Sequence, residues 1–531
     1  MLLSGSVGAG KTTLAERLAN DYSVHHIKTL NFLLNLSAKV ERSREALQLL
    51  GEKLDRETKG AWVRTSLEKV FREDEQLESK IVLVDAVRIE AQIEAIRAAY
   101  GQSVLHIHLE APPEELENRF QKRRRKGIAE APSYAKVQEN PTERQVVHLD
   151  RIADLVIDTK RCTIDDVVTR VASHLGLYGR EYLRLVDVMV GGQYGSEGKG
   201  QIAAYLAKDY DYLVRVGGPN AGHTVYLDPR PYVFHHLPSG TISNPKARLI
   251  IGAGAVIYAP TICQEIADRS VDCERLSIDP QAMIITKKDR RAESGLRNNI
   301  GSTAQGVGAA TARKITGREH GVVLAGSIPE LKPFIRDTRR VLEEAFCSRK
   351  RVLLEGTQGT GLSLHHGYYP YVTSRDTTVA GCLAEAGISP SRVRKVVMVC
   401  RTYPIRVQSP TGKTSGPMSQ EISWAEISRR SGIRVEELRR HEITSTTKRR
   451  RRVCEFDWVL LRKAATLNAP TDIALTFTDY LDAKNRDARR FEQLQKDTIL
   501  FIEEIERVAT APVSLISTRF HARSIIDRRS W

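Results

Sequence analysis

The chain has 531 residues, of which 41% are hydrophobic and 27% are charged, so it is long enough for two or three folded domains and does not have the composition of a disordered protein. Its net charge of +16 favours anionic partners, which include nucleotides and nucleic acids. No Cys-x-x-Cys pair occurs among the seven cysteines, and no apolar run is long enough to span a bilayer. We therefore expect a cytoplasmic enzyme without a structural zinc site, a disulfide framework or a membrane anchor.

A phosphate-binding motif opens the chain. Residues 1–4 predict a short strand, and residues 5–12 (GSVGAGKT) match the pattern G-x-x-x-x-G-K-[ST]. In such a loop the backbone between Gly5 and Gly10 cradles phosphates, Lys11 reaches the outer phosphates, and the Thr12 hydroxyl can bind Mg²⁺. Thr13 and residues 14–20 continue as a predicted helix, which is the context that the motif needs.

Further elements of the same kind follow in the first domain. Residues 32–77 predict a long helical section, and residues 81–85 predict a buried strand that ends at Asp85. Open α/β sheets place ligands at strand ends, so Asp85 can hold Mg²⁺ through water or meet a nucleotide hydroxyl, although it can equally cap the next helix. After a strand at 103–109, a helix ends in the basic run 119–126, where Arg123 can close over transferring phosphates or can simply be solvated.

These features together resemble the nucleoside monophosphate kinase group, including its dephospho-coenzyme A kinase-like members. The resemblance covers residues 1–178, including a last strand at 152–158, and depends mainly on the phosphate loop. It implies a parallel sheet with helices on both faces and a P-loop nucleotide kinase-like domain. The phosphate acceptor stays open.

A second phosphate loop begins the second domain, which we expect at residues 185–531. The apolar run 186–190 predicts a buried strand that breaks into the glycine-rich segment 191–200 (GGQYGSEGKG). Its glycines let backbone amides approach an anion, and Lys199 adds a positive charge. A strand at 212–216 then leads to the turn 217–224 (GGPNAGHT), where His223 can donate a proton to an oxygen that becomes negative or leaves.

Eight ordered segments of this domain resemble the adenylosuccinate synthetases, most closely their compact archaeal and viral branch. They are GGQYGSEGKG, GGPNAGHT, HHLPSG (235–240), IIGAGAVI (250–257), IGSTAQGVG (300–308), LEGTQGTGLSLHHGYYPYVTS (354–374), TSTTKRRRR (444–452) and LTFTDYLD (475–482). The resemblance implies an α/β domain with a central, mostly parallel sheet and a homodimeric ligase. Such an enzyme joins L-aspartate to C6 of a purine monophosphate through a 6-phosphoryl intermediate, with Mg²⁺ and ATP or GTP as the phosphate donor.

The resemblance also implies a role for individual positions. Catalytic positions are Ser196, Lys199, His223 and Gln358, and the carbonyl of Gly222 is a Mg²⁺ ligand. The positions that hold the purine monophosphate are Asn220, Thr303, Thr373, Arg449 and Arg318, the last across a dimer interface. Thr446, Thr447 and Arg451 recognise aspartate, whose carboxylate an arginine can grip with two hydrogen bonds. The triphosphate positions are Gly195, Glu197, Gly198, Gly200, Phe477, Asp479 and Ser517.

The chain departs from the family pattern at three places. Ser196 stands where the family has an aspartate that takes the N1 proton of the purine, and a serine hydroxyl has no useful pKa for that task. The serine form resembles the viral 2-aminoadenylosuccinate synthetases, which accept dGMP, so we expect dGMP as the acceptor. Phe477 replaces the lysine of the GTP-selecting motif while Asp479 keeps its carboxylate, and Arg519 replaces a loop glycine. GTP is therefore doubtful as the donor, and ATP or dATP competes with it.

Other functions remain open from the sequence. A conventional synthetase acting on IMP or dIMP is one alternative, and a non-catalytic nucleotide sensor with an ATP-driven switch is another. Binding of nucleic acid through basic runs such as 448–452 is a third, which the ordered motifs make unlikely. The presence of His223 and of an aspartate-recognition loop favours an enzyme, because a sensor has no use for aspartate.

Overall fold

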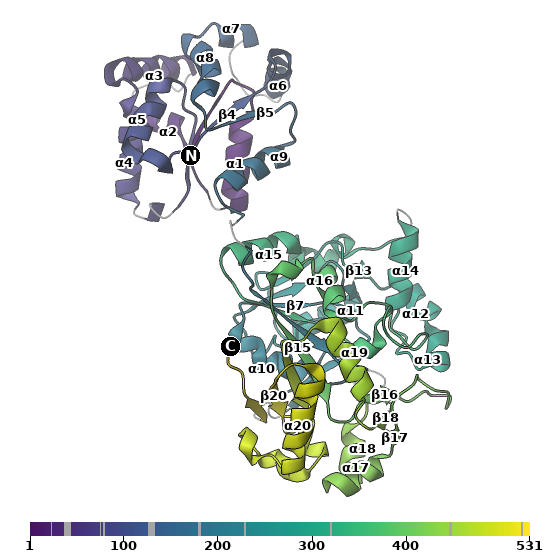
Figure 1. Cartoon of the computed structure of the whole chain (residues 1–531). Coiled ribbons are helices and arrows are strands. Elements are labelled where there is room, and N and C mark those ends of the chain that lie inside the picture. The colour runs from purple at the N-terminus through teal and green to yellow at the C-terminus, as the bar shows by residue number, and fades with distance from the viewer. Residues whose placement is uncertain are drawn as a thin grey trace. The chain divides into compact units, whose positions relative to one another are not determined.

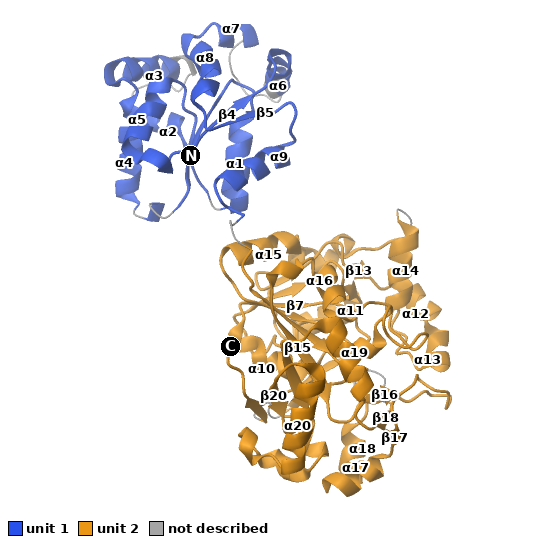
Figure 2. Cartoon of the chain, in the orientation of Figure 1, with its two compact units in different colours: residues 1–180 blue, residues 181–531 orange. Residues whose placement is uncertain are grey.

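The chain folds as two compact units, residues 1–180 and 181–531 (Figure 2). In the computed structural model the described residues are 1–22, 24–36, 44–74, 76–77, 80–125, 133–178, 182–227, 230–318, 321–444, 449–521 and 524–531. Each unit has its own sheet and its own apolar core.

Unit 1 is built on a five-stranded sheet with the order β2-β3-β1-β4-β5. Figure 1 shows strands β4 and β5 of this sheet with helices around them. Every pair of neighbouring strands in it is parallel. Parallel strands covered on both faces are largely apolar, which explains why four of the five strands are visible in the sequence. The strand at 25–28 (HHIK) is not apolar and was not predicted. The strands are β1 (Leu2–Gly5), β2 (His25–Lys28), β3 (Val82–Asp85), β4 (His106–Glu110) and β5 (Leu155–Asp158).

Helices cover both faces of this sheet, as expected. One apolar cluster joins the sheet to α1, α6 and α9, and a second joins it to α2, α4 and α5. The helices of the unit are α1 (Lys11–Tyr22), α2 (Thr29–Leu36), α3 (Arg44–Thr58), α4 (Ala61–Glu73), α5 (Glu90–Tyr100), α6 (Pro113–Arg125), α7 (Tyr134–Gln138), α8 (Pro141–Val146) and α9 (Ile164–His174).

The long helical section expected at 32–77 contains three separate helices, α2, α3 and α4. Between α3 and α4 the chain turns at Lys59 and Gly60, whose φ angles are 49° and 77°. A Cβ atom on Gly60 would lie 2.6 Å from the backbone nitrogen of Gln92, so the turn requires glycine at this position. Amphipathic periodicity continues across such a break and therefore does not reveal it.

Unit 2 is built on a nine-stranded sheet with the order β12-β10-β7-β14-β6-β15-β19-β20-β21. All neighbouring pairs are parallel except β20 and β21, so the expected α/β fold with a mostly parallel sheet is confirmed. The strands are β6 (Val186–Gly191), β7 (Tyr212–Arg215), β10 (Arg248–Ile251), β12 (Leu276–Ile278), β14 (Val352–Glu355), β15 (Val393–Arg401), β19 (Asp472–Thr476), β20 (Val513–Ser517) and β21 (Ile525–Asp527).

Strand β6 is the centre of this sheet, and its side chains alternate between two cores. Val186, Val188 and Val190 pack with α15, α16, α19 and α20, whereas Met189 packs with α10 and α11 on the opposite side. The helices of unit 2 are α10 (Lys199–Leu206), α11 (Ala259–Asp268), α12 (Lys287–Ala292), α13 (Ser294–Ile300), α14 (Val307–Gly317), α15 (Thr338–Cys347), α16 (Val379–Ala386), α17 (Trp424–Ser431), α18 (Val435–His441), α19 (Trp458–Asn468) and α20 (Lys496–Ala509).

Three small sheets flank the large one in unit 2. They are the hairpin β8 (His223–Leu227) with β9 (Arg230–Phe234), the pair β11 (Val256–Ile257) with β13 (Met283–Ile284), and the antiparallel sheet β16 (Ile405–Val407), β18 (Arg451–Cys454) and β17 (Glu421–Ile422). The loops that leave the carboxyl ends of β6, β7, β14, β15 and β19 meet at one edge of the large sheet, where parallel α/β sheets bind ligands. Among the described residues, no helix is both long and apolar enough to cross a membrane.

Candidate active site

The phosphate loop of unit 1 lies between β1 and α1. Gly5 and Gly10 have φ angles of 135° and 97°, and a Cβ on Gly5 would collide with the carbonyl of Leu109 at 2.1 Å. Lys11 Nζ donates to the carbonyl of Gly5 at 2.6 Å. Thr12 Oγ1 donates to Asp85 Oδ2 at 3.4 Å, across the ends of α1 and β3. Hydroxyl and carboxylate oxygens suit Mg²⁺, so Thr12 and Asp85 are the residues that would hold this ion beside a bound phosphate.

Other basic groups lie near this loop. Arg119 on α6 donates to the carbonyl of Gly8 at 3.4 Å and to Thr159 Oγ1 at 2.9 Å, which fixes its guanidinium beside the phosphate loop. Arg123 lies farther along α6, and its side chain is outside the described part of the structure. Thr13 is exposed in the first turn of α1. Arg119 therefore fits the role of a charge-neutralising arginine that the sequence suggested for the basic run.

In unit 2 the loop after β6 is shaped by an inward-facing carboxylate. Glu197 is fully buried and accepts hydrogen bonds from the amide of Gly195 at 2.8 Å and from Lys199 Nζ at 2.5 Å. Gly195, Ser196 and Gly198 have φ angles of 85°, 57° and 87°. This left-handed turn directs Glu197 into the protein and leaves Ser196 exposed. Glu197 thus organises the loop, although the family resemblance places it with the triphosphate.

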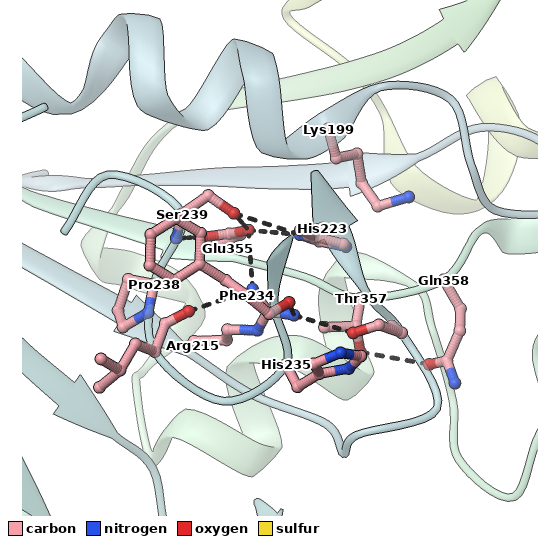
Figure 3. Close-up of polar contacts among 12 residues, drawn as sticks. Lys199, Arg215, His223, Phe234, His235, Pro238, Ser239, Glu355, Thr357 and Gln358 are labelled. Carbon is pink, nitrogen blue, oxygen red and sulfur yellow. Dashed lines mark hydrogen bonds and ion pairs between the residues drawn. The ribbon is translucent and has the colours of Figure 1, made fainter. Parts of the chain in front are cut away.

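The helix that follows the loop begins directly against His223. A Cβ atom on Gly200 would lie 2.9 Å from the Cβ of His223, so glycine allows α10 and β8 to approach this closely. His223 Nδ1 lies 2.5 Å from Glu355 Oε1 at the end of β14. Ser239 donates to the same carboxylate from its hydroxyl and from its amide, the latter at 2.7 Å (Figure 3). Arg215 Nη1 lies 3.4 Å from Glu355 Oε1.

The charges of this cluster set the protonation state of His223. Burial and the nearby Arg215 lower the pKa of His223 to about 4, against the opposing effect of Glu355. Burial by itself would raise the pKa of Glu355, but Arg215, His223 and Ser239 outweigh burial and lower it to about 2. The imidazole is therefore neutral near neutral pH, donates from Nδ1 to the ionised Glu355, and has a lone pair on Nε2.

The loop after β14 adds Gln358 to the same edge. Gln358 has a φ of 60°, and its Nε2 donates to Thr373 Oγ1 at 3.1 Å. Thr357 Oγ1 donates to Gln358 Oε1 at 3.2 Å. Asn220, in the turn after β7, has a buried Oδ1 without a hydrogen-bond partner among the described residues, as expected for a group that meets a ligand. The backbone of Gly222 lies in this turn as well.

Ser196 lies beside two arginines that share one carboxylate. Arg401 and Arg451 both donate to Glu442 at 2.8 Å, and Tyr480 OH donates to it at the same distance. Arg401 Nη1 also donates to the carbonyl of Ser196 at 3.3 Å, and Arg451 Nη2 lies 3.5 Å from Ser196 Oγ. Burial would raise the pKa of Glu442, but the arginines lower it to about 2. Two positive charges and one negative charge therefore face the position where the family has an aspartate.

The remaining residues assigned to the acceptor and to aspartate are only partly described. Arg449 Nη1 is buried without a hydrogen-bond partner among the described residues, and burial together with Arg297 lowers the pKa of Arg449. An unpaired guanidinium near a second arginine suits an anionic ligand. Thr446 and Thr447 lie outside the described residues. Thr303 is half-buried before α14, and Arg318 is exposed after it.

At the other end of the glycine-rich loop, three of the triphosphate positions, Gly198, Phe477 and Ser517, line a hollow. Phe477 has a φ of 60° at the end of β19, and Arg401 lies 4.2 Å from the centre of its ring. Asp479 Oδ2 accepts from Arg486 Nε at 3.1 Å, and burial raises the pKa of Asp479 to about 6 against the effect of Arg486. Ser517 donates to the carbonyl of Arg519 at 2.9 Å.

Several site residues were not assigned from the sequence. They are Arg215, Ser239, Glu355, Arg401 and Glu442, all buried. Glu355 ends an apolar strand immediately before a glycine-rich turn, which is the one signal that could have singled it out. Arg401 and Glu442 gave no such signal, because their importance depends on Ser196, which is more than 200 positions away in the chain.

Comparison with protein families gives two matches. The family model described as adenylosuccinate synthetase matches residues 188–327 and 323–486. The model described as an AAA domain matches residues 4–133, within unit 1.

Individual relatives agree with the first match. The adenylosuccinate synthetase of Thermococcus onnurineus is 38% identical over 350 residues, which are 64% of this chain and 98% of the relative. That of Methanocaldococcus jannaschii is 38% identical over 352 residues, which are 65% of this chain and 96% of the relative.

Two solved structures match as well. One is the fully ligated adenylosuccinate synthetase of Plasmodium falciparum, with a TM-score of 0.58, 22% identity, and coverage of 65% of this chain and 100% of that one. The other is the cyanophage S-2L succinoaminodeoxyadenylate synthetase bound to dGMP and to dATP as an energy donor. It has a TM-score of 0.55, 29% identity, and coverage of 66% of this chain and 96% of that one.

Proposed function

This chain belongs to the adenylosuccinate synthetase family and is a ligase of that type, and from this premise we propose that unit 2 joins L-aspartate to C6 of dGMP. The observation that carries the proposal is Ser196, which stands where the family has an aspartate. Ser196 is exposed at the site, and its Oγ lies 3.5 Å from Arg451 Nη2. The similarity to a viral synthetase whose structure holds dGMP supports the same acceptor. The product is 2-aminodeoxyadenylosuccinate.

The reaction has two steps. First, O6 of the purine attacks the γ-phosphorus of the donor, the bond to the bridging oxygen breaks, the nucleoside diphosphate leaves, and the N1 proton passes to solvent water. Second, the aspartate amine attacks C6, the C6–O bond breaks, phosphate leaves, and the amine loses a proton. Mg²⁺ neutralises charge on the triphosphate in such reactions, and the hydroxyl of Ser196 and the carbonyl of Gly222 are the oxygens that would lie near it.

The residues of this chain have distinct parts in these steps. The phosphates of a bound donor add negative charge near Lys199 and His223, which raises the pKa of His223 and allows its Nε2 to be protonated. Nε2 then donates to O6 as negative charge develops there, while Glu355 fixes the ring from Nδ1. Ser196 cannot accept the N1 proton as an aspartate would. Instead, the net positive charge of Arg401 and Arg451 over Glu442 stabilises the purine that has lost this proton.

A substrate screen tests the acceptor. With purified full-length protein, L-aspartate, Mg²⁺ and ATP or GTP, we expect kcat/KM for dGMP to exceed that for IMP by about a hundredfold. Formation of inorganic phosphate and of the succinylated nucleotide is followed for each purine. Turnover of IMP or dIMP alone would show a conventional adenylosuccinate synthetase, and binding of nucleotide without any dependence on aspartate would indicate a sensor.

For unit 1 we propose phosphoryl transfer from ATP to a nucleoside monophosphate of the same pathway. The contact between Thr12 and Asp85 and the position of Arg119 at the loop support this proposal. Replacing Lys11 by alanine is expected to reduce formation of nucleoside diphosphate, measured without aspartate, by about a hundredfold or more. The ligase reaction of the same variant serves as the internal control. Equal kinase rates in both proteins, or no accepted monophosphate at all, would contradict the kinase assignment.

A further inference from the structure

A narrow hollow lies beside the glycine-rich loop of unit 2. Its lining residues are Gly198, Gln201, Thr476, Phe477, Ser517 and Phe520, which come from the loop, α10, β19, β20 and the segment after β20. It opens to solvent, and its roughly 180 Å³ of space includes part of that open solvent, so the hollow is too narrow for a base until its walls move apart. Gly198 belongs to the loop that is expected to bind the phosphates, so the hollow lies next to the expected position of the triphosphate chain. We call this hollow the base slot.

Two phenylalanine rings bound the base slot. The rings of Phe477 and Phe520 are parallel within 1°, and their centres are 6.4 Å apart. A flat ring between them needs two contacts of about 3.5 Å each, and the planes of the two rings are at most as far apart as their centres, so the slot has to widen by at least roughly half an ångström. Phe520 can move by that amount, since it is 36% exposed on the segment between β20 and β21.

Contacts outside the base slot hold the ring of Phe477 in place. The guanidinium of Arg401 lies 4.2 Å from the centre of the ring, and Arg401 is fully buried and bonded to Glu442. The Cε2 atom of Phe477 would lie 3.6 Å from a Cβ atom placed on Gly198, so the absence of a side chain at Gly198 keeps the edge of the slot open. One wall of the slot is therefore rigid, and the other, Phe520, is adjustable.

The carboxylate expected to select guanine is not presented to the base slot. Asp479 is absent from its lining, and Asp479 Oδ1 is buried in the protein without a hydrogen-bond partner among the described residues. Its Oδ2 accepts from Arg486, which also donates to Glu437 at 2.7 Å. Arg486 thus holds Oδ2, and the side chain of Asp479 does not line the slot in which the base would stack.

We propose that the purine of the donor triphosphate is sandwiched between Phe477 and Phe520, and that this site accepts adenine and guanine almost equally. The proposal rests on the proposed function in one respect, since it takes the base slot as the donor end of the ligase. Stacking on aromatic rings does not discriminate between bases, because each base has a π-face. Phe520 is thus a residue that binds the donor base through its aromatic face, whichever purine the donor carries.

Binding titrations test the sandwich without any catalytic step. All proteins carry Lys11→Ala, so that the loop of unit 1 does not contribute to the signal. The probe is 2-aminopurine riboside triphosphate with Mg²⁺, whose fluorescence is quenched by stacking, and ATP and GTP compete with it. We expect the Kd values of ATP and GTP to agree within about tenfold. Phe520→Leu should raise the Kd values of ATP and GTP by roughly tenfold to a hundredfold and reduce the quenching. Phe520→Trp should leave the Kd values and the quenching unchanged.

The outcomes separate this proposal from the proposed function. Unchanged affinity and quenching in Phe520→Leu would overturn the sandwich, and so would a preference above about a hundredfold for one base that Asp479→Asn abolishes. The titrations contain neither purine monophosphate nor aspartate, so they do not depend on dGMP being the acceptor. If no triphosphate binds at all to the parent protein, the ligase proposal fails together with the sandwich. Phe520→Leu and Phe520→Trp retain an apolar side chain at a partly exposed position, which keeps the comparison independent of folding.

Discussion

Replacing Ser196 by aspartate is expected to change the preferred acceptor from dGMP to IMP, with the ratio of their kcat/KM values moving by about a hundredfold or more. The new carboxylate can take the N1 proton of the purine directly, and a correctly placed general base increases the rate by about a hundredfold or more. Position 196 has a φ of 57°, which aspartate adopts more readily than most residues. Arg451, 3.5 Å from Ser196 Oγ, would pair with the new charge, so stability should change little.

A matched substitution separates charge from size at this position. Ser196→Asn has nearly the shape of Ser196→Asp but cannot accept a proton at neutral pH, so it should lose activity toward dGMP without gaining activity toward IMP. The measurement is kcat/KM for both purines at saturating aspartate and triphosphate. A Ser196→Asp enzyme that still prefers dGMP would show that another residue chooses the purine.

The largest loss of rate is expected for His223→Asn, with kcat lower by a factor of about 10² to 10⁴ and smaller changes in KM. His223 lies against Glu355, Lys199 and the start of α10, where an asparagine cannot carry a proton to the departing oxygen. Because burial and Arg215 lower the pKa of His223 to about 4 in the free protein, its protonated form has to arise in the substrate complex. The pH dependence of kcat/KM, which reports the free enzyme, should therefore show no step near 6.5 from this residue.

The control for His223 is the same substitution at an exposed histidine. His174, at the end of α9 in unit 1, is exposed, and His174→Asn should leave the ligase kinetics unchanged. Thermal unfolding of His223→Asn should still show a cooperative transition, because Glu355 retains its contacts with Ser239 and Arg215. A kcat within about threefold of the parent enzyme would remove His223 from the proton-transfer step.

Local sequence was sufficient for the parts of the site that depend on neighbouring residues. The loops at residues 5–12 and 191–200 were predicted correctly as strand, glycine-rich turn and helix, since β1 and α1 flank the first and β6 and α10 flank the second. The positive φ angles of Gly10 and Gly198 are a local requirement that glycine satisfies at once. The helical break at Gly60 escaped prediction because its cause, the backbone of Gln92, lies in another element.

The sequence by itself determined the family, the two nucleotide loops, and the substitution at Ser196, because each is written in contiguous residues. Tertiary structure alone decided what surrounds that serine. Glu355 reaches His223 from β14, Glu442 holds Arg401 and Arg451 beside Ser196, and Phe520 closes the base slot opposite Phe477. The physical reason is that strand order in a parallel sheet, not spacing in the chain, determines which strand ends meet.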